Sequence, residues 1–181
     1  MNEDRTLTQK GIYATEINEA NSLILSHLYA SNTLQNLNQQ ELLIVLSTMM
    51  QVEEKEPTSR NSLNLNSNLN YVFDEGEKFC KQIETAEYEE QISYAPYILN
   101  YEYVTILQEL FNGASVGTVC ESFEIMEGNL NRFLLKLLNI VDELKNVATL
   151  NSDVRILELL ENVRAYDFYK IAIPESLYMH I

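Results

Sequence analysis

Residues 128–147 have the apolar spacing of a long helix with one buried face. The apolar side chains recur at i, i+3, i+4 and i+7. They are Leu130, Phe133, Leu134, Leu137, Val141 and Leu144. This spacing predicts a helix that packs along its whole length, and the rest of the chain must provide a core for it.

The opposite side of this predicted helix carries polar residues, two of them cations. Arg132, Lys136, Asn139 and Glu143 fall at i, i+4, i+7 and i+11, so they line up along the helix axis. Like charges one turn apart cost about 0.2 to 0.5 kcal/mol, and a bound anion or nucleic-acid backbone would relieve that cost. We therefore take Arg132, Lys136 and Asn139 as the candidate binding residues.

The remaining segments also predict helices, with almost no two-residue alternation. Asn21 or Ser22 is expected to cap a helix through Tyr29, and Asn38 with Glu41 forms the pattern of a capping box. Further helices are expected at 72–92, loosened near a glycine at 76, and from Pro96 to a stop at 112–113. A short helix then precedes the long one, and a helix capped at 151 or 152 runs through 163. The expected fold class is all-α: a helical bundle with a helix-turn-helix-like segment.

Length and composition predict one domain over residues 1–181, with a polar tail at 1–8 and a flexible loop at 54–68. The chain is 46% hydrophobic, enough for one core, and its net charge is −15. Such acidity argues against a protein that coats nucleic acid, because that affinity comes from neutralised phosphates. Any nucleic-acid contact is therefore expected to be local.

No catalytic motif stands out in the sequence. There is no phosphate-binding loop of the G-x-x-x-x-G-K-[ST] type, and the acidic run at 74–77 is interpreted as a solvated turn. Cys80 and Cys120 lack metal-ligand spacing with each other or with the histidines, which indicates reduced thiols and an intracellular location. No cofactor and no membrane span are expected in this chain.

Several segments, in order, resemble one known family. The pattern G-x-S-F-x-E-I-C-x-x-T-x-x-F-E-G-S-x-I-R-x-x-R-R-L is matched without a gap at seven positions: Gly113, Ser115, Cys120, Glu127, Gly128, Arg132 and Leu137. Residues 10–18, 23–28, 37–47 and 176–178 agree with four further segments of the family. The chain thus resembles the DSHCT domain, the C-terminal helical domain of exosome-associated DExH-box RNA helicases of the Ski and Mtr type. It departs from the family in three ways. The chain has no Trp, where the family has one before the position of Gly113; Leu135-Lys136 replaces the Arg pair; and Asn139 replaces an acidic residue one turn later.

The resemblance implies a function that the residues alone do not. In those helicases the corresponding helix is a ratchet that lines the path of the RNA strand beneath two RecA-like domains. It implies contacts of Arg132, Lys136 and Asn139 with single-stranded RNA, in an ATP-dependent 3′–5′ helicase of RNA processing or decay. The implied partners are the RecA-like domains, RNA and exosome-associated proteins, and the implied ATP and Mg²⁺ belong to the motor domains.

Two alternatives remain open from the sequence. A short helix, a turn and a longer helix are also the outline of a helix-turn-helix DNA-binding domain. The second alternative is a free-standing helical module that binds a protein partner.

Glu127-Gly128 is expected to form the turn between the short and the long helix, because glycine permits close backbone approach. Four tyrosines are candidates for stacking on bases but are interpreted as core or interface residues instead: Tyr94, Tyr97, Tyr101 and Tyr103.

Overall fold

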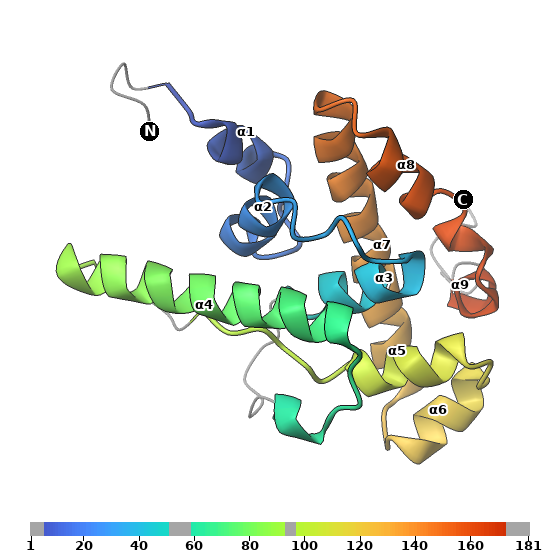
Figure 1. The fold of residues 1–181 in the computed structure, drawn as a ribbon. Coiled ribbons are helices and arrows are strands. Elements are labelled where there is room, and N and C mark those ends of the chain that lie inside the picture. The colour runs from blue at the N-terminus through green and yellow to red at the C-terminus, as the bar shows by residue number, and fades with distance from the viewer. Residues whose placement is uncertain (1–5, 51–58, 93–96, 173–181) are drawn as a thin grey trace, which may run out of the picture.

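The computed structural model describes residues 6–50, 59–92 and 97–172, and these residues form an all-α bundle (Figure 1). Nine α-helices and two short 3-10 turns lie in the described ranges, joined by short connections. The α-helices are α1 (Gln9–Thr15), α2 (Ser22–Ala30), α3 (Gln39–Ser47), α4 (Ser67–Glu89), α5 (Val104–Phe111), α6 (Val116–Ser122), α7 (Glu127–Leu150), α8 (Val154–Leu160) and α9 (Asp167–Ala172). The all-α expectation is confirmed.

The short helix α3 lies at the centre of the bundle. Every residue from Glu41 to Met50 is buried, which leaves α3 almost no solvent-facing side. It packs against α4, α5 and α7, and α7 crosses behind it in Figure 1. A helix that is apolar nearly all round is stable only inside a core, and the other helices provide that core.

Side-chain caps fix where most of these helices begin. Asn38 and Glu41 form the predicted capping box, since the Asn38 side chain accepts from the Glu41 N–H while Glu41 accepts from the Asn38 N–H. The Asn21 side chain caps α2 as predicted. At α8 the cap is Asp153, so the predicted cap at 151 or 152 was wrong by one or two residues, and α8 ends at Leu160 rather than 163.

Three other predicted boundaries differ from the structure. Helix α4 is continuous through Gly76. Gly76 is buried, and a Cβ on it would lie 3.1 Å from Leu99 Cδ1. This close packing outweighs the low helix propensity of glycine. Residues 97–103 are not helical and α5 begins at Val104, while Pro96 lies outside the described residues. Helix α1 was not predicted, although Thr8 caps it through the Gly11 N–H.

The tail and the loop of the sequence interpretation are described only in part. Thr8 already belongs to the cap of α1, and residues 1–5 are outside the described ranges. Within 54–68, residues Arg60–Ser62 form a 3-10 turn and Ser67 begins α4, while 54–58 are not described. The segment 176–178 used in the family resemblance is also outside them.

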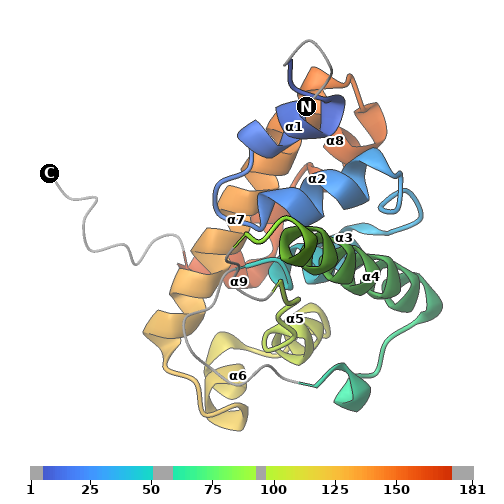
Figure 2. The ribbon, with the colours of Figure 1, turned by 90° about the vertical axis from the view of Figure 1, so that its left-hand side faces the viewer.

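The two ends of the described chain pack together. The Tyr13 hydroxyl donates to Asn151 Oδ1 at 2.6 Å, and Arg155 donates to the Leu37 carbonyl at 2.9 Å. Figure 2 shows α1 and α2 beside the end of α7 and α8. Residues more than a hundred positions apart therefore share one core.

Candidate nucleic-acid interface

Helix α7 presents one buried side and one open side, as the periodicity predicted. Ten of its residues are buried, among them all six that defined the apolar pattern. Phe133 anchors the first half by stacking on Tyr103, with ring centroids 3.8 Å apart and planes 6° apart. This packing fixes the rotation of α7 and therefore the direction of its polar side chains.

Arg132, Lys136 and Asn139 are all exposed on the open side of α7. None of the three forms an ion pair or a side-chain hydrogen bond with any residue in the described ranges 6–50, 59–92 and 97–172. Figure 2 shows the first half of α7, which carries them, at the edge of the ribbon. The structure thus brings together the three residues that the sequence singled out, and leaves their polar groups available.

Two other cations near α7, Lys145 and Arg164, have an acidic partner. Asp142 accepts from Arg164 at 2.7 Å and from Lys145 at 3.5 Å. These two cations share the single negative charge of Asp142. Arg132 and Lys136 differ from them, because no carboxylate of the described residues lies within ion-pair distance.

Glu143, the fourth residue of the predicted polar line, has a structural task. Its Oε1 and Oε2 accept hydrogen bonds from the Glu19 N–H at 3.1 and 3.2 Å. Glu143 is half-buried, so the open side of α7 ends one turn earlier than the pattern indicated. The pairing spans 124 residues, and no local pattern signals it.

The turn between α6 and α7 is made differently from the prediction. Gly128 lies inside the first turn of α7, is exposed, and a Cβ there would meet no atom within 4 Å, so close backbone approach is not the reason for a glycine. The residue with left-handed backbone is Glu124, at φ 51°. Met126 at the N-cap offers no side-chain hydrogen bond, which leaves backbone N–H groups of the first turn without a cap.

Leu135 lies beside the candidate binding residues but was not one of them in the sequence analysis. It is 40% exposed and lies next to Lys136 on α7. In the sequence, the one indication that Leu135 is exposed is its position between the buried and open sides of the periodic pattern. An exposed leucine beside two cations gives this helix face an apolar component.

The tyrosines are used in packing, as expected. Tyr101 is buried, meets Phe73 edge-on, and its hydroxyl donates to Glu77 Oε1 at 2.6 Å. Burial and this hydrogen bond raise its pKa. Tyr97 donates to Glu87 at 2.8 Å, Tyr103 stacks on Phe133, and Tyr94 lies outside the described residues.

The described residues contain no group of three or more His, Cys, Asp or Glu side chains that would hold a metal ion. None of their helices is long and apolar enough to cross a membrane. What the fold and the helix face define is a class: a compact helical domain with an unpaired cationic helix face.

Sequence comparison identifies the family within that class. The sequence model of the DSHCT (NUC185) domain matches residues 4–164. The chain therefore belongs to the DSHCT domain family, and domains of this family are C-terminal domains of DExH-box helicases. No curated protein matched the chain.

Proposed function

We propose that this chain is the RNA-channel domain of an ATP-dependent 3′–5′ RNA helicase, in which the open side of α7 contacts single-stranded RNA. The observation that carries the proposal is the pair of unpaired, exposed cations on a rigidly packed helix, in a chain of net charge −15. Phosphates of the strand would relieve the repulsion between Arg132 and Lys136. Asn139, one turn further on, offers both a donor and an acceptor to a base edge.

The start of α7 supports contact with a backbone phosphate as well. Its first turn has no side-chain cap, and Gly128 leaves the backbone there uncovered. Helix N-termini carry partial positive charge and free N–H groups, which favour anions. Arg132 lies one turn beyond Gly128, so both groups face the same stretch of a bound strand.

The rest of the proposed assembly follows from the family. ATP and Mg²⁺ would bind in RecA-like motor domains, against which this domain packs, and exosome-associated proteins would be further partners in RNA processing or decay. A native polypeptide several times larger than the 20.9 kDa of this chain, with RNA-dependent ATPase activity, would support that assignment.

A single strand fits this surface better than a DNA duplex does. Helix-turn-helix domains position a duplex through several phosphate contacts from both helices. Here α6, with the sequence VGTVCES, has no Lys or Arg, and α7 offers two free cations on its open side. The structure thus favours a narrow contact along one helix over docking in a major groove.

The direct test removes the two cations. Arg132→Ala/Lys136→Ala in the 181-residue chain is compared with the native sequence for binding to a fluorescent single-stranded oligouridylate across a salt series. Each lost phosphate contact should lower the slope of log K against log salt by about 0.7, so the double variant should lose about 1.4.

A matched control separates this contact from general electrostatics. Lys78→Ala/Lys81→Ala removes the same charge from α4 and should leave affinity and slope nearly unchanged. Equal losses in both variants, or unchanged binding in the first, would exclude α7 from the RNA path. Thermal unfolding of each variant verifies that the fold is retained.

A further inference from the structure

A polar groove on another part of the surface is lined by side-chain amides. It has a volume of about 580 Å³ and lies between α3, the segment before α4, and the end of α5. Its lining includes Gln40 from α3, Asn64 and Asn66 before α4, Gln108 from α5, and Asn112 directly after α5. A concavity of this size lies within the range that binds drug-sized ligands or a few peptide residues.

The walls of this amide groove are held by hydrogen bonds within the protein. Glu41 is 6% exposed, and its Oε1 accepts from Asn66 Nδ2 at 2.6 Å while Oε2 accepts from the Asn38 N–H at 2.8 Å. Gln108 Nε2 donates to the Asn64 carbonyl at 3.1 Å, which ties α5 to the segment before α4. The groove is thus formed before any ligand arrives.

Other amides in the groove have no partner. The side chains of Asn64 and Asn112 are exposed and form no hydrogen bond with any residue that the structure describes. Each offers donors through its NH₂ group and an acceptor through its oxygen. Two free amides at one concavity match a ligand that needs both donors and acceptors.

The charge of the lining decides which ligand that is. Glu41 and Glu109 line the groove, and none of its described lining residues is Lys or Arg. Nucleic-acid affinity depends on cations that neutralise phosphates, so a strand of RNA is disfavoured here. An extended peptide instead presents alternating N–H and C=O groups that must be satisfied, and a basic residue in it would meet exposed Glu109.

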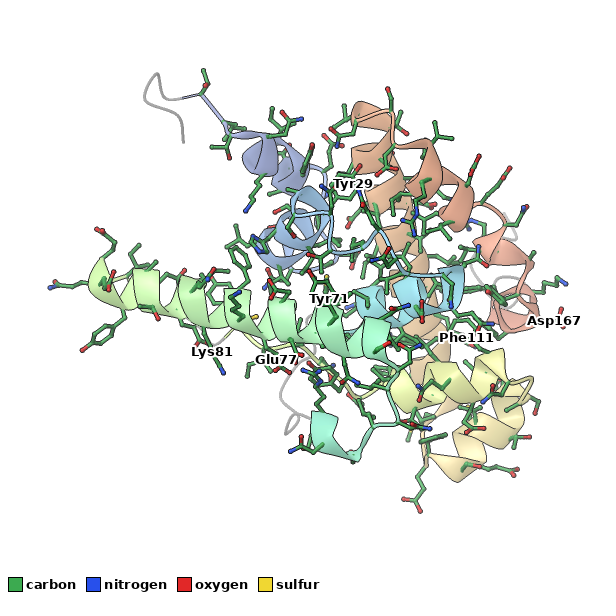
Figure 3. The ribbon with its side chains drawn as sticks, in the orientation of Figure 1. Tyr29, Tyr71, Glu77, Lys81, Phe111 and Asp167 are labelled. Carbon is green, nitrogen blue, oxygen red and sulfur yellow. The ribbon has the colours of Figure 1, made fainter. Side chains whose placement is uncertain are left out.

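Phe111 adds an apolar contact at the same place. It lines the groove, is half-buried, and is packed from behind by Tyr166 and Phe168, with centroids 5.2 and 5.7 Å away. Figure 3 labels it where α5 faces α9. A rigidly held ring beside free amides suits an apolar peptide side chain next to a hydrogen-bonded backbone.

From these contacts we infer that the amide groove binds an extended, basic peptide segment of a partner protein. This site is separate from the α7 face and does not depend on the proposed RNA function. The free amides of the groove form hydrogen bonds with the peptide backbone, Phe111 packs against one apolar peptide side chain, and Glu109 pairs with a Lys or Arg of the peptide.

The experiment uses the immobilised 181-residue chain and three pools of labelled random octapeptides. The pools differ only in a central residue fixed as Lys, Ala or Glu. The Lys pool should be retained about two- to fivefold better than the Glu pool, as expected for one exposed ion pair. Glu109→Lys, on an exposed position, should reverse this preference.

The free amides are tested in the same assay. Asn64→Ala/Asn112→Ala should lower retention of the Lys pool about tenfold, whereas Gln82→Ala/Asn146→Ala, which removes two exposed amides elsewhere, should not change it. Retention of none of the pools, an unchanged preference in Glu109→Lys, or equal losses in both double variants would overturn the inference. Displacement of the peptides by octauridylate would do so as well, because the groove would then be a nucleic-acid site.

Discussion

Glu143 on α7 holds the backbone N–H of Glu19 with both carboxylate oxygens, at 3.1 and 3.2 Å. Glu19 lies in the connection between α1 and α2, so this contact joins the N-terminal segment to the long helix. A carboxylate that accepts from a part-buried N–H satisfies a donor that would otherwise lose its partner.

Removal of this carboxylate should destabilise the domain. Glu143→Ala is expected to lower the free energy of unfolding by about 1 to 3 kcal/mol, because a part-buried backbone donor is left unpaired. Urea denaturation measures the change. Glu158→Ala, which removes an exposed carboxylate from α8, is the matched control and should stay within about 0.5 kcal/mol. Equal effects would mean that the Glu143 contact contributes nothing of its own.

Gly128 should tolerate a side chain without loss of stability. A Cβ there meets no atom within 4 Å, so Gly128→Ala should raise the free energy of unfolding by about 0.5 kcal/mol through helix propensity. Gly76→Ala is the informative comparison, because its Cβ would come 3.1 Å from Leu99 Cδ1 and the gain should shrink or reverse. Urea titration of both variants distinguishes the two surroundings, and a clearly destabilised Gly128→Ala would contradict the open site.

Stability should fall as the pH falls below 6.5 because of His27. The His27 ring stacks on the Phe79 ring, with centroids 3.6 Å apart. Lys10 Nζ donates a hydrogen bond to His27 Nδ1 at 2.8 Å, and this bond requires an unprotonated Nδ1. Burial chiefly, then Lys10, lowers the His27 pKa from 6.5, while Glu75 raises it and Lys78 lowers it. The fold therefore disfavours the proton: the stabilisation is present above pH 6.5 and is lost as the pH falls through the lowered pKa.

An NMR titration of the His27 ring measures this pKa directly. Lys10→Met removes one cause of the lowering and should move the pKa upward, with a weaker pH dependence of unfolding. A His27 pKa at or above 6.5 in the native chain would refute the prediction.

The two cysteines should react at different rates with a thiol reagent. Cys80 is buried, and burial raises its pKa to about 11, which lowers the thiolate fraction about hundredfold relative to a pKa of 9.0. Cys120 is half-buried and also has a raised pKa, from burial and Glu127. Iodoacetamide at pH 8 should modify Cys120 first and Cys80 only on unfolding, as peptide mass spectrometry would show. Comparable rates in the folded protein would contradict the burial of Cys80.

The features that sequence predicted well are those that neighbouring residues determine. The Asn38–Glu41 capping box and the open side of α7 both follow from spacings of three or four residues, and both are confirmed in the structure. The start of α5 was missed because residues 97–103 are held by tertiary contacts, such as the Asn100 N–H donating to the Thr48 carbonyl at 2.7 Å. The same limit hid the Glu143 contact, which no short-range pattern encodes.

The amide groove is a second feature that the sequence alone could not predict. Asn64 and Asn66 fall within the flexible loop predicted at 54–68. Its function as a groove wall depends on Gln108, more than forty residues away, which holds the Asn64 carbonyl. Composition identified the residues, but only the packing of α5 against them shows which amides stay free.

The contacts between the two ends of the chain have a consequence during synthesis. Tyr13 bonds with Asn151 across 138 positions, and Tyr29 with Asp153 across 124. When α2 and α3 leave the ribosome, the partners that cover them have not yet been translated, so their apolar surface stays uncovered until the last helices emerge. Long-range closure of this kind delays folding and lengthens the exposure of aggregation-prone surface. For this domain, the core is complete only after α7 and α8 have been translated.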